Sequence, residues 1–113
     1  MTRNILLAAL LVAAPAFAHH GWSSYDEAKP LTVTGTFSKL DWANPHGTAT
    51  MTRDKQPWTI VLAPTQRMET RGLTQAMVAP GKPVTLVGYA RRDGVREMRI
   101  ERVTADGKTV ELR

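Results

Sequence analysis

Short segments of alternating apolar and polar residues, rich in β-branched side chains, constrain the fold of this chain most strongly. The segment Leu31–Leu40 reads LTVTGTFSKL and places Leu31, Val33 and Phe37 on one side. An alternation with period two, combined with β-branched residues, predicts a strand. By the same criteria we expect further strands at 46–53, 58–63, 83–89, 97–104 and 109–112. The chain is therefore predicted to be mostly β.

One stretch of the chain favours a helix. Thr65 is a candidate N-cap for a short helix that runs through Arg71 and ends at Gly72, and Thr74 is a candidate cap for one more turn. Three strands, a short helical link, two strands and a short terminal strand match a small five-stranded OB-like barrel, which is a partly open Greek key. An open sheet or a sandwich built from the same strands is the alternative.

Turn residues separate the predicted strands. We expect turns at Lys55-Gln56-Pro57, Asp93-Gly94 and Asp106-Gly107. Gly35 and Gly88 lie inside strands, where they suit the sharp bends of a small barrel.

An apolar run near the start of the chain indicates export. Ile5–Ala14 reads ILLAALLVAA, follows Arg3, and is followed by Pro15 and by Ala16-Phe17-Ala18. A basic start, an apolar run and an A-x-A site are the parts of a secretory signal peptide. The run has about half of the roughly 20 apolar residues that span a bilayer. We therefore expect a cleavable signal peptide at 1–18, no membrane span after cleavage, and a periplasmic or secreted protein.

The remaining chain divides into an extended polar arm at 19–30 and an OB-like domain at 31–113. It has no cysteine, which excludes disulfides and thiolate chemistry. The formal charge of +5 becomes +4 once Arg3 leaves with the signal peptide. Basic residues alternate with acidic ones, as in Arg92-Asp93 and Arg96-Glu97, and we interpret Arg91-Arg92 as part of a solvated hairpin. This pattern is typical of an ordinary soluble surface, so nucleic acid is not expected as a partner.

The motifs of the chain resemble those of a family of small exported bacterial proteins classed as a domain of unknown function. Members of that family begin after the signal peptide with paired histidines and carry a Trp-x-Asn-Pro-His motif. The matching segments here are HHGWSSYD at 19–26, WANPHG at 42–47 and PVTLVGY at 83–89. The resemblance implies an exported OB-like β-barrel and carries over no activity.

Three histidines suggest a metal site. Cleavage after Ala18 would make His19 the amino terminus, so its amine and imidazole could chelate one ion together with His20 or His46. Nitrogen ligands of this kind suit Cu(II), and copper is therefore the candidate cofactor. The alternative is that His19 and His20 are only a polar start and that His46 is an ordinary loop residue.

Other candidate residues point to binding rather than catalysis. Trp22 and Trp42 are candidate binding or outer packing residues near the histidines. The sequence contains no catalytic signature, so an enzyme is not expected. The prediction is a non-catalytic binding module, with a small ligand, copper or an envelope protein as partner. A protein-interaction scaffold without metal and a nucleic-acid-binding OB domain are the alternatives.

Overall fold

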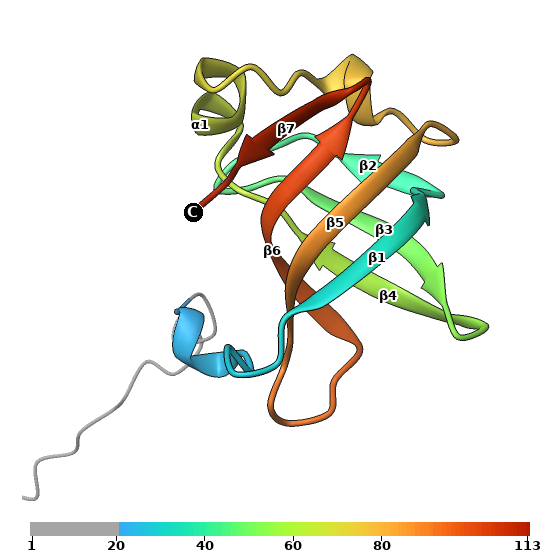
Figure 1. Cartoon of the computed structure of the whole chain (residues 1–113), viewed down its shortest axis with the longest axis vertical. Helices are drawn as coiled ribbons and strands as arrows, with labels where there is room; N and C mark the ends of the chain where they lie inside the picture. The colour runs from blue at the N-terminus through green and yellow to red at the C-terminus, as the bar shows by residue number, and fades with distance from the viewer. Residues whose placement is uncertain (1–20) are drawn as a thin grey trace, which may run out of the picture.

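Strands are the main secondary structure in the described part of the chain, residues 21–113 of the computed structural model (Figure 1). The strands are β1 (Leu31–Thr36), β2 (Lys39–Asp41), β3 (Thr48–Arg53), β4 (Gln56–Val61), β5 (Pro83–Ala90), β6 (Glu97–Ala105) and β7 (Lys108–Glu111). One helix, α1 (Thr65–Thr70), and two 3-10 turns, η2 (Trp22–Ser24) and η3 (Gln75–Val78), accompany them in the described residues. The predicted signal peptide at 1–18 and the candidate ligands His19 and His20 lie outside this range. Within it, no helix has the length and apolarity needed to cross a membrane.

The strands form one curled sheet in the order β1-β5-β6-β4-β3-β2, and β7 pairs with the second half of β6, beyond the part of β6 that pairs with β4. All neighbours are antiparallel except β4 and β6, which pair in parallel from Thr59 opposite Glu97 to Val61 opposite Arg99. Figure 1 shows the sheet curling round so that β1, β5 and β6 lie across from β2, β3 and β4. The backbone N–H of Ser38 donates to the carbonyl of Thr50 (2.9 Å), which holds the corner between β1 and β2 against β3. The predicted mostly-β fold is confirmed.

The core lies inside the curl and follows the alternation of the strands. Ala49 and Met51 of β3 and Met98 and Ile100 of β6 point inward and are buried. The helical link between β4 and β5 covers one end of the curl, where it buries Met68, Leu73 and Val78 (Figure 1). The intervening residues of β3, β4 and β6 therefore lie on the outer face, which is where the candidate site is found.

The predicted strand at 31–40 is two strands, because the chain turns at Phe37. This side chain is buried, and its carbonyl accepts a hydrogen bond from the N–H of Gly81 (3.0 Å). Gly35 pairs with Val84 in regular register, so the described structure has no β-bulge there. At Gly88, where a bend was also predicted, the register between β5 and β6 shifts between Val87 and Gly88.

Two further local predictions need correction. The turn between β3 and β4 is at Asp54-Lys55, both with positive φ (53° and 65°), and Pro57 already pairs with Thr52 in the sheet. The N-cap of α1 is Pro64 rather than Thr65. The predicted helix end at Gly72 (φ 97°) and the turn at Asp106-Gly107 (φ 51° and 74°) are confirmed.

Candidate functional site

The described part of the amino-terminal arm, residues 21–30, is docked onto the sheet. Tyr25 forms an isolated antiparallel bridge with Arg91, and the N–H of Asp26 donates to the carbonyl of Ala90 (2.8 Å). The Tyr25 side chain is buried, and its hydroxyl donates to the carboxylate of Glu97. The arm was predicted to be extended. This is wrong at η2 (Trp22–Ser24), where the chain makes a 3-10 turn before it reaches the bridge at Tyr25.

Trp22 anchors the arm at a second point. Its ring contacts the guanidinium groups of Arg99 (4.3 Å) and Arg113 (4.2 Å) and meets the ring of Tyr89 edge-on. Arg113 also forms an ion pair with Glu27 of the arm (2.6 Å). The candidate binding residue Trp22 thus packs between the arm and the sheet.

One arginine of the hairpin contacts the same arm from an exposed position, so Arg92 does more than decorate a solvated hairpin, whereas the Arg91 side chain pairs within the hairpin. The Arg91 side chain is about one-fifth exposed (19%) and pairs with Asp93 (2.6 Å). The Arg92 side chain donates to the carbonyl of Ser23 (3.0 Å), and its backbone N–H donates to the carbonyl of Ser24. The local charge pattern did not show the two contacts of Arg92, because their partners Ser23 and Ser24 lie almost seventy positions earlier in the chain.

The loop at 42–47 approaches the arm from the other side. Gly47 is buried, donates its N–H to the carbonyl of Ala63 (2.9 Å) and accepts from the N–H of Leu62 (2.9 Å). These two bonds fix His46, the preceding residue, against the outer face of β3 and β4. Trp42, at the start of the loop, donates its indole N–H to Glu69 of α1 (3.0 Å). The structure therefore separates the two predicted tryptophans and joins Trp42 to the helix.

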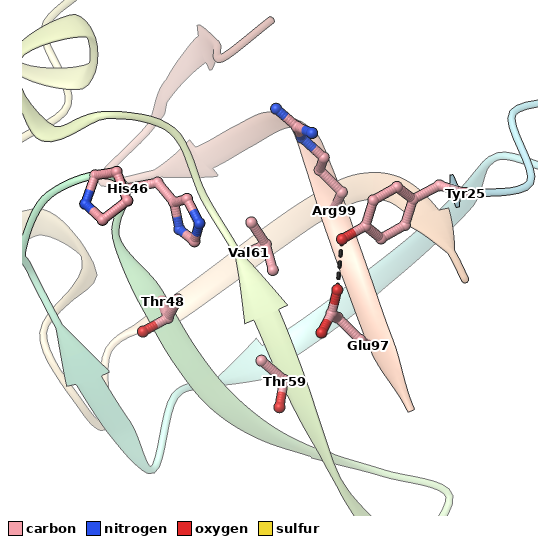
Figure 2. A pocket seen from close by; sticks show the side chains of 8 residues that line it. Tyr25, His46, Thr48, Thr59, Val61, Glu97 and Arg99 are labelled. Atoms are coloured by element: carbon pink, nitrogen blue, oxygen red, sulfur yellow. Dashed lines mark hydrogen bonds between the residues drawn. The ribbon is translucent and has the colours of Figure 1, made fainter. Parts of the chain in front are cut away.

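A cavity of about 320 Å³ lies between the arm and this loop. Figure 2 shows His46 on one side, the side chains from the arm and β6 on the other, and Val61 between them. The residues that line it come from the arm, the loop and three strands: Tyr25, Pro45, His46, Thr48, Thr59, Val61, Glu97 and Arg99. Neither Trp22 nor Trp42 is among the lining residues.

Burial shapes the charges on the arm side of the cavity. Burial and the hydrogen bond to Glu97 raise the pKa of Tyr25 above its ordinary value, so the phenol remains a donor. Burial lowers the pKa of Arg99, and the nearby charges of Arg113 and Arg67 act in the same direction. The Arg99 guanidinium nevertheless stays protonated, because its ordinary pKa is above 12. One wall of the cavity thus carries the Arg99 cation and the Glu97 carboxylate, which accepts a hydrogen bond from Tyr25, and the other wall carries the imidazole of His46.

The described residues do not by themselves offer a metal centre. Within 21–113, no three side chains of histidine, cysteine, aspartate or glutamate gather in a way that could hold an ion. His46 is half-buried, and its Nδ1 lies 3.4 Å from the carbonyl oxygen of Gly47. Copper binding by His46 would therefore need ligands from His19 and His20, which lie outside the described residues.

Sequence reasoning identified His46 but missed Tyr25, Glu97 and Arg99. One signal was present, because Glu97 and Arg99 alternate with the apolar Met98 and Ile100 and so had to share the outer face of a strand. The sequence could not show that this face lies across a cavity from His46, because that arrangement depends on the parallel pairing of β4 with β6.

The amino-acid sequence also relates the chain to other proteins. No characterised protein matches it in sequence. A family of unknown function (DUF6152) matches residues 7–99, which include the arm, the 42–47 loop and every residue that lines the cavity. Because this match covers most of the chain, the protein belongs to the DUF6152 family of unknown function.

Proposed function

We propose that the protein is an exported, non-catalytic binding module whose ligand occupies the cavity between the arm and the 42–47 loop. The observation that carries this proposal is the convergence of five separate segments on one cavity of about 320 Å³. Cavities of roughly 300 Å³ and above are of the size that holds small ligands. Export to the periplasm or beyond rests on the signal-peptide pattern at 1–18.

The strand order supports an OB-like barrel whose ligand-binding face contains this cavity. If β1 and β2 are two halves of one bent first strand, the pairing becomes that of a five-stranded Greek-key barrel. OB-like barrels bind ligands on the face of their second and third strands and with the adjoining loops. Here these strands are β3 and β4, and the loop between the first and second strands contains His46.

Cu(II) is the specific ligand that we propose for the histidine side of this cavity. The arm is fixed to the sheet at Tyr25 and Trp22, and His20 and His19 precede Trp22 by only two and three positions. Since each residue spans at most about 3.6 Å, the docked arm limits how far these histidines lie from the cavity. An amine and imidazoles form a set of nitrogen ligands, and such a set binds Cu(II) more tightly than the other first-row divalent ions.

The test is a Cu(II) titration, followed by calorimetry, of protein processed in and purified from a bacterial periplasm, so that its amino terminus is native. We expect one equivalent to bind, and His46→Ala to weaken binding by at least about tenfold, the loss of one strong ligand. Thr48→Ala is the matched control, because Thr48 lines the same cavity but offers no nitrogen. A tag placed before His19, which moves the free amine away from the histidines, should abolish tight binding.

Binding that is weak and unaffected by His46→Ala would remove copper from the proposal. The cavity would then remain as a site for another small ligand, or the outer face would be a surface for an envelope protein. A salt-dependent shift with single-stranded DNA would instead support the nucleic-acid alternative.

A further inference from the structure

We propose that the cavity selects an uncharged small molecule with a mainly apolar body. This inference rests on the binding-module proposal, since it uses the same cavity, and it is independent of copper.

Two buried side chains of this cavity do not belong to the core inside the curl. Val61 is only 8% exposed and Tyr25 only 1% exposed, yet neither is part of the core cluster of the described residues. Both line the cavity instead, and Val61 lies between its arm side and its loop side (Figure 2). The molecule therefore has a second sheltered apolar region, separate from its core, where a ligand can make contact.

Uncharged residues of adjacent strands form the floor of the cavity. Thr48 of β3 lies opposite Val61 of β4, and Thr59 is two positions before Val61 on the same face. Each threonine offers a methyl group for apolar contact and a hydroxyl that can donate or accept a hydrogen bond. Pro45 adds apolar surface from the loop. A mainly apolar pocket with a few polar groups is the usual form of a small-molecule site, and a volume of about 320 Å³ is at the lower end for such sites.

The two charged side chains that β6 contributes to the cavity wall have opposite signs, and both already have protein partners. The Glu97 carboxylate accepts the hydroxyl proton of Tyr25, and its Oε2 lies 3.7 Å from Nη1 of Arg91. The Arg99 guanidinium lies over the ring of Trp22, with 4.3 Å from its central carbon to the ring centroid. An ionised ligand would have to give up part of its hydration beside side chains whose charges are already balanced, and this costs affinity. An uncharged ligand avoids that cost and keeps the apolar contact with the floor.

The experiment compares three probes of one shape on isotope-labelled, EDTA-dialysed protein with its native amino terminus. The probes are 4-methylbenzyl alcohol, 4-methylbenzoate and 4-methylbenzylamine, which carry a neutral group, an anion and a cation. We expect the alcohol to shift the amide signals of Tyr25, Thr48 and Val61 with a Kd of about 1 to 10 mM, the range for ligands of this size. Both charged probes should bind at least about tenfold more weakly. Ethanol, which lacks the apolar ring, should also bind at least about tenfold more weakly.

Two pairs of variants locate the ligand. Val61→Thr keeps the volume of the side chain but replaces a methyl group with a hydroxyl, and it should weaken binding of the alcohol by about threefold or more. Val87→Thr is its control, because Val87 lies on β5 and does not line the cavity. Thr59→Phe should block binding by filling the cavity from an exposed position, whereas Thr52→Phe, at an exposed position of β3 outside the cavity, should not.

The outcomes distinguish this inference from the proposed function. If either charged probe shifts the same amides and binds as tightly as the alcohol, selection of an uncharged ligand is wrong, but the cavity remains a binding site. Full affinity for the alcohol in both Val61→Thr and Thr59→Phe would overturn the inference by placing the probe elsewhere. If no probe causes a shift at these concentrations, the inference is overturned as well, and the binding module then depends on the copper titration alone.

Discussion

Gly88 occupies a position where the two central strands approach too closely for a side chain. A Cβ at this residue would overlap the carbonyl oxygen of Arg99 and lie 2.9 Å from the Cα of Ile100. Gly88→Ala should therefore destabilise the protein by about 2 to 3 kcal/mol, as expected for an overpacked site. Urea denaturation measures this loss through the midpoint of unfolding. The amide signals of Arg99 should also move, because relief of the overlap must shift the backbone of β6 at the cavity.

Gly35→Ala is the matched control for this substitution. A Cβ at Gly35 would meet only the Met51 side chain at 3.6 Å, which is an ordinary contact. Alanine also restricts the unfolded chain more than glycine does, so stability should stay within about 1 kcal/mol of the original. Equal losses for the two substitutions would show that close approach is not what requires Gly88.

Asp93 makes the hairpin between β5 and β6 sensitive to acid. The side chain of Arg91 and the N–H of Val95 both donate to its carboxylate, and together they lower its pKa to about 2. The unfolded pKa is about 3.9, so the folded value is depressed. The stabilisation is therefore present above about pH 4 and is lost as the pH falls toward 2. A carboxyl-carbon NMR titration of the folded protein should give a midpoint near pH 2 for Asp93.

Arg91→Gln tests the cause of this shift. Without the guanidinium, the midpoint for Asp93 should move up toward the ordinary aspartate value of about 3.9. Arg92→Gln is the control, because Arg92 binds the carbonyl of Ser23 rather than Asp93. A midpoint that stays near pH 2 in Arg91→Gln would assign the shift to the Val95 amide instead.

The arm should depend on Trp22 for its attachment to the sheet. Trp22→Ala removes the contacts with Arg99 and Arg113 and the edge-on contact with Tyr89. Cation–π contacts at partly exposed sites contribute about 0.5 to 1 kcal/mol each, so we expect a local loss of about 1 to 2 kcal/mol. Native-state hydrogen exchange should show faster exchange at the N–H groups of Asp26 and Arg92, which bond across the arm and the hairpin.

Trp58→Ala is the control for the arm. Trp58 also contacts an arginine, Arg53 (4.7 Å), but it lies on β4 near the β3–β4 turn. Its removal should leave exchange at Asp26 and Arg92 unchanged. Faster exchange at these two amides in both variants would mean that the arm follows the stability of the whole sheet rather than its own contacts.

The elements predicted from the sequence differ from the observed ones where a distant contact decides the structure. The alternation in β5 and β6 predicted both strands to within one residue, because one face of each strand is buried. The break after β1 was missed, since burial of Phe37 and its bond with Gly81 depend on residues far along the chain. The turn at Asp54-Lys55 was displaced because no glycine marks its two positive φ values.

The site was predicted in part for the same reason. His46 stood out by residue type and by its motif, whereas Arg99 and Glu97 had the same local pattern as other interleaved charges. What distinguishes these two residues is their position opposite Val61 and Thr59 in the parallel pair. The docking of Tyr25 beside them depends on a bridge to Arg91, which no local pattern of the arm encodes.

The pairing of the sheet also has a consequence for the order of events during biosynthesis. Among residues 21–113, β1 pairs only with β5, and β4 meets β6 only after the helical link, so the curl closes through contacts between distant parts of the chain. Chains dominated by such contacts fold slowly, over milliseconds to seconds. β1, the first of the described strands, therefore has to wait until β5 has left the ribosome, although β2, β3 and β4 can already pair with one another. For the exported chain that we propose, this delay keeps the precursor unfolded while the secretion machinery engages it.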